Sequence, residues 1–188
     1  EAVRDWKVTQ TFGSPAIWDR VGRYCEEHGV RLPTVRRVLS AGAPVPGCVL
    51  QRMKACIHAE GEVHTPYGAT EALPVASIAA SEVLRETSAR TGEGAGVCVG
   101  RRFPGIQWKI IRIVDGPIRS MEEAEELPAG RIGELIVRGP QVTRCYVTRA
   151  EANTLGKIPD GPSVWHRMGD AGYLDQQERF WFCGRLAH

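Results

Sequence analysis

The sequence of 188 residues lacks two features that would place it in a specialised class of protein. No apolar run approaches the roughly 18 residues that a membrane-spanning helix needs. No excess of charge of one sign is present either, since the net charge is +2 at pH 7 and basic and acidic residues nearly balance in both halves. A one-signed surface field of the kind that binds nucleic acid is therefore not expected. We predict no transmembrane segment and no nucleic-acid partner.

Cysteine occurs six times, but the residues are scattered and none forms a Cys-x-x-Cys pair. In a chain with an ordinary core, this pattern indicates reduced thiols and a cytoplasmic location. Hydrophobic residues make up 43% of the chain and charged residues 24%. These proportions are those of a globular protein, and they exclude a disordered tail, a collagen-like chain and a coiled coil.

The first half of the chain alternates short strands with single helices. Ser14 and Pro15 indicate the start of one helix, and Pro46 the start of another. Strands are expected at residues 8–12, 35–39, 62–65 and 74–80. Because single helices separate the strands, parallel pairing with right-handed crossovers is favoured. We predict that residues 1–95 form an α/β part with a partial parallel sheet.

The second half has a different pattern. Residues 91–96 are rich in glycine and are expected to form a flexible connection. Beyond them, strand-like segments at 107–114, 133–137 and 179–183 are separated by turn residues, and no long amphipathic helix is visible. Short strands with turns between them favour a small β-barrel-like subdomain, which we predict over residues 96–188.

The segment Tyr67-Gly68-Ala69-Thr70-Glu71 directly follows a predicted strand. Strand ends of open α/β sheets are the places where such folds bind ligands. The hydroxyl of Thr70 suits a phosphate oxygen, and the carboxylate of Glu71 suits Mg²⁺. The alternative is a structural one, in which Thr70 caps a helix and Glu71 interacts with the helix dipole.

Two other segments have a similar position after predicted strands. Ser40-Ala41-Gly42-Ala43-Pro44 consists of small residues that allow close approach of a planar ligand. In the segment from Arg167 to Tyr173, Asp170 can accept hydrogen bonds from the two hydroxyls of a ribose, and Arg185 can support the sugar or a phosphate. The structural alternative here is a Gly-Asp hairpin turn with a surface ion pair.

In their order, these segments resemble the adenylate-forming superfamily, which comprises acyl-CoA synthetases, luciferases and the adenylation domains of peptide synthetases. The resemblance extends over most of the chain. It rests on Ala41–Pro44, Tyr67–Ala72, the Gly-Glu-Leu-Ile-Val-Arg-Gly-Pro segment 133–140, Gly169-Asp170 with Gly172-Tyr173, and Gly184-Arg185.

The resemblance implies a role for each matching residue. Thr70 and Glu71 would be catalytic, with Thr70 on the α-phosphate of ATP and Glu71 holding Mg²⁺. The other implied nucleotide-binding residues are Gly42, Ala43 and Pro44 beside the adenine, Tyr67 against the adenine, Gly68 where the acyl group approaches, and Asp170 and Arg185 at the ribose.

The implied reaction is the attack of a carboxylate on the α-phosphate of ATP, which gives acyl-AMP and pyrophosphate. The chain would be a fragment of the large N-terminal domain of such an enzyme. The phosphate loop of the family is expected before Glu1, and the C-terminal domain with its lysine after His188. The chain alone is therefore not expected to catalyse adenylation.

Several residues depart from the usual pattern of the superfamily, namely Met168 before Gly-Asp, Cys145 before Tyr146, and Ala187 at the hinge position. The segments 165–175 and 180–185 resemble the β-lactone synthetases of bacterial olefin biosynthesis. This resemblance implies a long-chain 2-alkyl-3-hydroxy acid as substrate and a ring closure without CoA. Two alternatives stay open, a fatty-acyl-CoA ligase that uses CoA and a non-catalytic nucleotide-binding or interaction module. His64 and His166, near the site segments, are expected to be structural.

Overall fold

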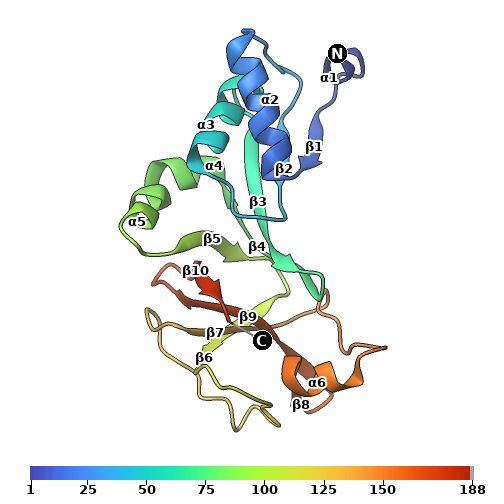
Figure 1. The fold of residues 1–188 in the computed structure, drawn as a ribbon, viewed down its shortest axis with the longest axis vertical. Helices are drawn as coiled ribbons and strands as arrows, with labels where there is room; N and C mark the ends of the chain where they lie inside the picture. The colour runs from blue at the N-terminus through green and yellow to red at the C-terminus, as the bar shows by residue number, and fades with distance from the viewer. Residues whose placement is uncertain (187–188) are drawn as a thin grey trace. The chain divides into compact units, whose positions relative to one another are not determined.

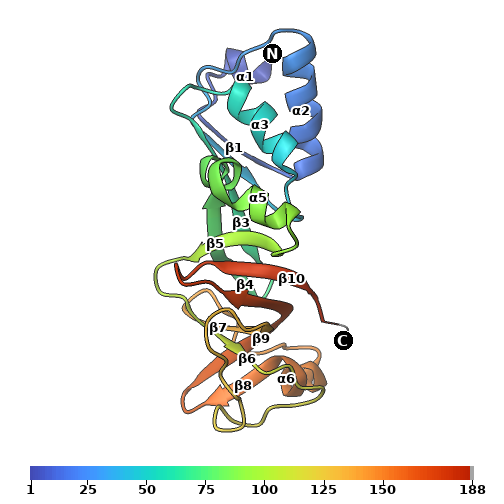
Figure 2. The same ribbon diagram turned by 90° about the vertical axis from the view of Figure 1, so that its left-hand side faces the viewer.

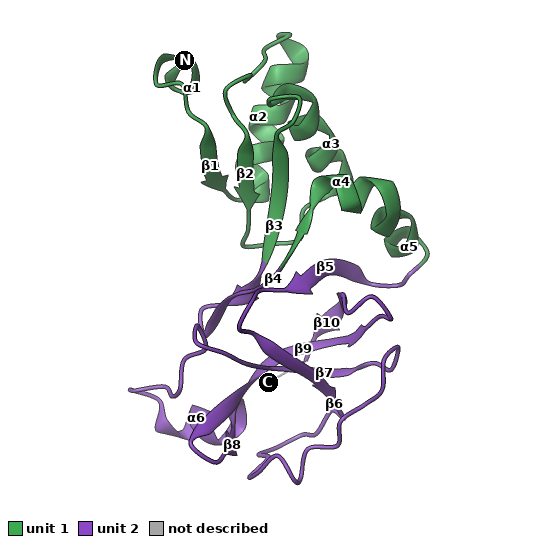
Figure 3. Ribbon diagram, turned by 180° about the vertical axis from the view of Figure 1, so that it is seen from behind, with its two compact units in different colours: residues 1–66, 77–93 green, residues 67–76, 94–188 purple. Residues whose placement is uncertain are grey.

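The structure is a computed structural model that describes residues 1–186, drawn as a ribbon in Figure 1. The chain divides into two compact units (Figure 3). The first comprises residues 1–66 and 77–93, and the second residues 67–76 with the chain from residue 94 onward. The Tyr67–Glu71 segment therefore belongs to the second unit, although it precedes residue 95 in the sequence.

The first unit has the expected alternation of strand and helix. Strands β1 (Gln10–Gly13), β2 (Arg37–Ser40) and the beginning of β3 (Glu62–Ala69) pair in parallel. Helices α2 (Pro15–Glu27) and α3 (Gly47–Cys56) lie side by side on one face of these strands (Figures 1 and 2). The remaining elements are α1 (Ala2–Asp5), the end of β4 (Ala72–Ala79), α4 (Ala80–Glu82), a π-helical turn (Val83–Thr87) and α5 (Ser88–Gly92).

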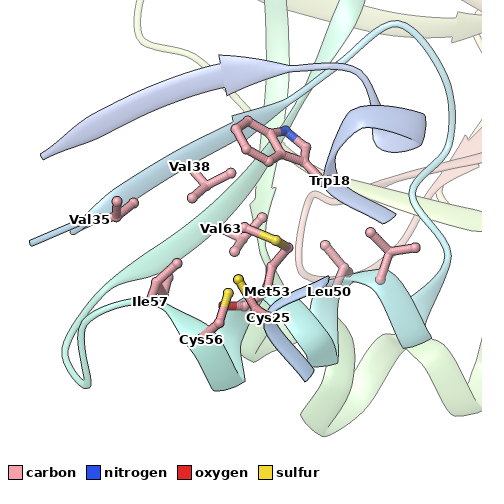
Figure 4. Packing of buried hydrophobic residues seen from close by; sticks show 11 residues of the cluster. Trp18, Cys25, Val35, Val38, Leu50, Met53, Cys56, Ile57 and Val63 are labelled. Atoms are coloured by element: carbon pink, nitrogen blue, oxygen red, sulfur yellow. The ribbon is translucent and has the colours of Figure 1, made fainter. Parts of the chain in front are cut away.

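The core of the first unit is apolar and lies between the helices and the strands. Trp18 of α2 and Met53 of α3 pack with Val38 and Val63 of the neighbouring strands (Figure 4). These residues are the inward-facing positions of short elements that alternate in sequence, and their burial stabilises the parallel arrangement by about 1.5–3 kcal/mol for each large side chain.

The second unit is built on antiparallel strands. Their order is β5 (Val97–Arg102), β10 (Phe180–Arg185), β9 (Ser163–Leu174), β7 (Gly133–Arg138) and β6 (Gln107–Ile111). The short strand β8 (Lys157–Asp160) pairs with the first part of β9, and the seven-residue helix α6 (Ala150–Gly156) directly precedes β8. Met168, a departure from the family pattern, is buried among the apolar side chains of this unit.

A buried ion pair joins the centre of this sheet to the loops around it. Arg167 of β9 donates two hydrogen bonds of 3.0 and 2.6 Å to Glu134 Oε2 of β7. The same guanidinium donates to the carbonyl oxygens of Val114 and Gly116, at 2.8 and 2.6 Å, and to that of Leu155, at 3.2 Å. Arg167 therefore fastens the loop after β6 and the end of α6 to the sheet.

The structure corrects the sequence analysis at two places. The helical segment from Ala80 to Gly92 was not expected. Gly169 and Asp170 lie within β9, so the alternative of a Gly-Asp hairpin turn is wrong. The turn between β9 and β10 is formed instead at Asp175, whose carboxylate accepts hydrogen bonds from the backbone amides of Gln177 and Arg179. Within residues 1–186, none of the helices is long and apolar enough to cross a membrane.

Candidate functional site

The segment that carries the strongest sequence signal forms the link between two strands. Strand β3 continues to Ala69, Thr70 and Glu71 make the turn, and β4 begins at Ala72. The structural alternative, in which Thr70 caps a helix, is therefore wrong. Thr70 is exposed to solvent and Glu71 is partly buried. A hydroxyl and a carboxylate thus lie next to each other at an accessible turn.

One end of this segment is fixed to β9 through Asp170. The hydroxyl of Tyr67 donates a hydrogen bond to Asp170 Oδ2, and Arg185 of β10 donates to Oδ1 at 2.9 Å. The Asp170 side chain is 3% exposed, whereas that of Arg185 is 67% exposed. Burial, together with the neighbouring Asp170 carboxylate, raises the pKa of Tyr67, which therefore stays a hydrogen-bond donor.

The other end of the segment is fixed by the loop that follows β7. The backbone amide of Thr143 donates to the carbonyl oxygen of Glu71 at 2.8 Å. The hydroxyl of Tyr146 donates to Glu71 Oε1, also at 2.8 Å. Burial and this hydrogen bond raise the pKa of Tyr146 to about 12. For the Glu71 carboxyl, burial acts to raise the pKa, but the Tyr146 hydrogen bond, a backbone hydrogen bond and the positive charge of Lys157 hold it below its ordinary value.

Tyr146 is itself held by the short helix α6. Its backbone amide donates to Asn153 Oδ1 at 2.7 Å, and Asn153 Nδ2 donates back to the Tyr146 carbonyl oxygen at 3.0 Å. This reciprocal pair fixes the backbone of Tyr146 in front of Glu71. No sequence pattern assigned residues 149–153 to the site. The only local signal for the contact with Tyr146 is the amide side chain of Asn153, which can both donate and accept a hydrogen bond.

Two further side chains complete the Glu71 end. Lys157 begins β8, where it pairs in register with His166 of β9. Its ammonium donates to the carbonyl oxygen of Thr143 at 2.5 Å and to the Thr143 hydroxyl at 3.1 Å. It also lies 5.4 Å from the centre of the Tyr146 ring.

His166 is buried beside these groups. Burial, assisted by the positive charge of Lys157, lowers the pKa of His166 to about 4. Its Nδ1 lies 3.0 Å from the carbonyl oxygen of Gly156. A neutral ring with its proton on Nδ1 donates to this oxygen and leaves Nε2 as an acceptor.

Gly68 lies in the middle of the segment, where the backbone of β4 is very close. A Cβ atom at this position would be 2.4 Å from the Ala72 carbonyl oxygen and 2.9 Å from Leu73 Cδ1. Any larger residue would therefore push the two strands apart. Glycine at this position therefore allows β3 and β4 to pair closely next to the turn.

The small-residue segment of the first unit follows β2. Gly42 has a φ of +95°, which favours glycine, and a Cβ there would meet nothing within 4 Å. Gly42, Ala43 and Pro44 are exposed, so their backbone is accessible to a planar ligand. The hydroxyl of Ser40, directly before them, is buried without a hydrogen-bond partner among the described residues. Buried polar groups without a hydrogen-bond partner are uncommon in proteins.

The resemblance implies a bound divalent cation. Whether the site could bind one depends on which oxygen ligands its side chains offer. No cluster of three or more metal-binding side chains occurs within residues 1–186. Mg²⁺, however, binds through one or two carboxylates, keeps several waters and takes substrate phosphates as further ligands. Glu71 meets this requirement, because Tyr146 occupies only Oε1 and the carboxylate is partly accessible.

The structure thus places six of the predicted site residues in the second unit, namely Tyr67, Gly68, Thr70, Glu71, Asp170 and Arg185. Hydrogen bonds join Tyr67, Asp170 and Arg185 directly. The structure adds Tyr146, Asn153 and Lys157, which the sequence analysis did not assign to the site. Lys157 could have been noticed, because it is one of only four lysines in a chain whose other basic residues are arginine. The departure at Ala187 lies outside the described residues.

Residues 1–147 match the family described as AMP-binding enzyme. The chain is 45% identical over 190 residues to an olefin beta-lactone synthetase of Stenotrophomonas maltophilia (strain K279a), with 98% of this chain and 34% of the relative covered. It is 31% identical over 186 residues to 4-coumarate--CoA ligase-like 6 of Oryza sativa subsp. japonica, with 98% of this chain and 28% of the relative covered.

Among solved structures, the amide bond synthetase McbA from Marinactinospora thermotolerans superposes with a TM-score of 0.74 at 25% identity, covering 99% of this chain and 33% of that chain. The chain spans about a third of the length of the curated relatives that it matches. The family match covers well over half of the residues. The chain therefore belongs to the AMP-binding, adenylate-forming enzyme family.

Proposed function

We propose that the chain is the part of an ATP-dependent acid-activating enzyme that carries its ribose and metal contacts. The complete protein would join a carboxylic acid to the α-phosphate of ATP and release pyrophosphate. The observation that carries this proposal is the Asp170 carboxylate, which is buried and held by Tyr67 on one oxygen and by the exposed Arg185 on the other.

Each side chain of the site has a definite task in this reaction. Asp170 accepts the ribose hydroxyls, and Arg185 supports the same sugar. The hydroxyl of Thr70 donates a hydrogen bond to the α-phosphate, and Glu71 would hold Mg²⁺. When it is bound, the metal neutralises phosphate charge and so stabilises the charge that develops at the reacting phosphorus. Gly42, Ala43 and Pro44 supply an accessible backbone edge for the adenine. For Gly68 we keep the proposed position beside the acyl group, although the space that its missing Cβ leaves is filled by the backbone of β4.

For the second half of the reaction, we propose closure of a β-lactone. The substrate would be a long-chain 2-alkyl-3-hydroxy acid, whose own hydroxyl attacks the acyl carbon, with loss of the hydroxyl proton and departure of AMP. The support is the 45% identity to an olefin beta-lactone synthetase, against 31% to a protein named as a 4-coumarate--CoA ligase-like enzyme. Burial of Met168, where the family usually has a hydroxyl, is a further difference at this site.

A fatty-acyl-CoA ligase is the second candidate, because CoA ligases occur among the relatives. Its thioester would form by attack of the CoA thiol on the same acyl adenylate. We also propose a cytoplasmic location, which is supported by the six free cysteines within the described residues.

The test uses the complete protein with ATP, Mg²⁺ and a long-chain 2-alkyl-3-hydroxy acid, with and without CoA. Pyrophosphate release and the mass of the acyl product are followed together. A product lighter than the acid by one water, formed without CoA, supports the β-lactone. A thioester that forms only with CoA supports the ligase. Absence of pyrophosphate release in both reactions would indicate a non-catalytic nucleotide-binding module.

A further inference from the structure

The Lys157 ammonium, at the Glu71 end of the site, has no carboxylate in direct contact among the described residues, and its one charge-dependent contact is with the Tyr146 ring. Lys157 is 6% exposed, and both acceptors of its ammonium are neutral oxygen atoms of Thr143. No carboxylate oxygen lies within 4.0 Å of its Nζ among the described residues. Burial of a charge without a counter-charge is costly, and a neutral donor could hold Thr143 equally well.

One N–H group of the Lys157 ammonium is not used by Thr143. A protonated lysine carries three N–H donors, and Thr143 accepts two of them. Glu71 is the nearby carboxylate whose charge acts on Lys157, and Tyr146 lies between the two as hydrogen-bond partner of one and ring neighbour of the other. The remaining donor and the net positive charge therefore belong to the same end of the site as the proposed metal ligand.

The position of Lys157 relative to Asp170 along β9 indicates which part of a nucleotide would lie near Lys157. Lys157 pairs with His166, and Asp170 follows four residues later on the same strand. At about 3.3 Å for each residue, this places Lys157 about 13 Å from the ribose contact. A nucleotide whose sugar lies at Asp170 reaches this far only with the outer part of its phosphate chain.

We propose that Lys157 is a phosphate-binding residue that contacts the outer phosphates of ATP and, after adenylation, the pyrophosphate product. The inference rests on the proposed function and extends it, because it assigns the leaving group to Lys157 and the sugar to Asp170. It also gives a role to the lysine that lies near Glu71, the residue that would hold Mg²⁺. With Mg²⁺ on Glu71, the negative charges of the phosphate chain would offset the positive charges of both the metal and Lys157.

The experiment measures binding to the complete protein by calorimetry, with Mg²⁺-pyrophosphate and AMP as separate ligands. Lys157→Met removes the charge and keeps the length of the side chain. We expect pyrophosphate affinity to fall about tenfold to a hundredfold, as for loss of a hydrogen bond to a charged group, and AMP affinity to change by less than about threefold. Lys157→Arg, which retains the charge, is expected to retain most of the pyrophosphate affinity.

Lys109→Met is the matched control, since Lys109 pairs with Glu126 on the outer strand β6 and has no contact with Glu71. It should leave both affinities unchanged. Thermal melting by circular dichroism shows whether each variant is folded, and Lys157→Gln replaces the methionine variant if that one is not.

Three results would overturn the proposal. Unchanged pyrophosphate affinity in a folded Lys157→Met would exclude Lys157 from the phosphate site. Equal losses for AMP and pyrophosphate would show a general structural role. A wild-type protein that binds neither ligand would overturn the proposed function as well. Failure of the Lys157 assignment alone is recognised by a wild-type protein that binds both ligands.

Discussion

Tyr67 and Asp170 lie 103 residues apart in the sequence, and the hydroxyl of Tyr67 donates a hydrogen bond to the Asp170 carboxylate. This contact joins the end of β3 to the middle of β9, and it buries a carboxylate that would otherwise be free to rotate. Arg185 donates to the other oxygen of the same group. The orientation of the carboxylate that we propose as the ribose contact is therefore fixed by the protein itself.

Removal of the Tyr67 hydroxyl should leave Asp170 Oδ2 without its donor. We expect Tyr67→Phe to lower the free energy of unfolding by about 1–3 kcal/mol, because a buried charged group loses a hydrogen bond. Urea denaturation of the wild type and the variant measures this difference. Tyr24→Phe is the control, since Tyr24 is exposed and only stacks on His28. Equal effects of the two substitutions would contradict a special role of the Tyr67 hydroxyl.

Substitution of the carboxylate itself tests the ribose assignment. In the complete protein, Asp170→Ala should weaken ATP binding by about tenfold or more, as expected for lost hydrogen bonds to a charged acceptor. Calorimetric titration with ATP measures the change, and Asp115→Ala, at an exposed loop position, serves as the control. Unchanged affinity in a folded Asp170→Ala would refute the assignment of Asp170 to the ribose.

The Glu134–Arg167 pair should be important for stability rather than for chemistry. Glu134→Gln leaves a buried guanidinium without its counter-charge, and such a change costs about 3–5 kcal/mol. Glu125→Gln, which breaks the exposed pair with Arg112, should cost less than about 1 kcal/mol. Chemical denaturation of both variants provides the comparison. Similar losses for the buried and the exposed pair would show that burial of Arg167 has no such effect.

His166 should make stability depend on pH. Its pKa is about 4 in the folded chain, held down by burial and by Lys157 and only partly restored by Glu71 and Gly156, whereas an ordinary histidine has a value of 6.5. Between these two values the unfolded chain binds more protons than the folded chain. Stability is therefore greatest above pH 6.5 and falls as the pH decreases toward 4.

The replacement His166→Gln should remove this part of the pH dependence. We expect the loss of stability between pH 7 and pH 5 to be smaller in the variant by on the order of 1–2 kcal/mol. Melting temperatures at several pH values measure it, with His28→Gln as the exposed control. A variant with the same pH profile as the wild type would show that His166 is not buried in its neutral form.

Local sequence patterns were sufficient to predict the parallel strands of the first unit and the two helices α2 and α3. The helices that begin at Pro15 and Gly47 and the parallel strands between them were expected, because alternation of strands and helices is visible within a few tens of residues. The helical segment after Ala79 was missed, since its polar residues give little periodicity. The family resemblance, which depended on the order of several short motifs, is confirmed by the match over residues 1–147.

The parts of the site that were missed depend on contacts between distant segments. Tyr146 approaches Glu71 from 75 residues away, and its position is fixed by Asn153 across the start of α6. Neither contact has a local sequence pattern. Strand β9 was not predicted, because Gly169 and Gly172 resemble turn residues in the sequence. In the structure Gly169 has a φ of +66° within the strand.

The central claim is that the carboxylate of an acid attacks the α-phosphate of ATP. It is tested most directly with an acid whose carboxyl oxygens are labelled with ¹⁸O, incubated with the complete protein, ATP and Mg²⁺. In the proposed reaction one carboxyl oxygen forms a bond to phosphorus, and the bond from this oxygen to the acyl carbon later breaks. Mass spectrometry should therefore find one ¹⁸O atom in AMP, whether the product is a lactone or a thioester. Unlabelled AMP, or ¹⁸O recovered in inorganic phosphate beside ADP, would contradict the proposed adenylation.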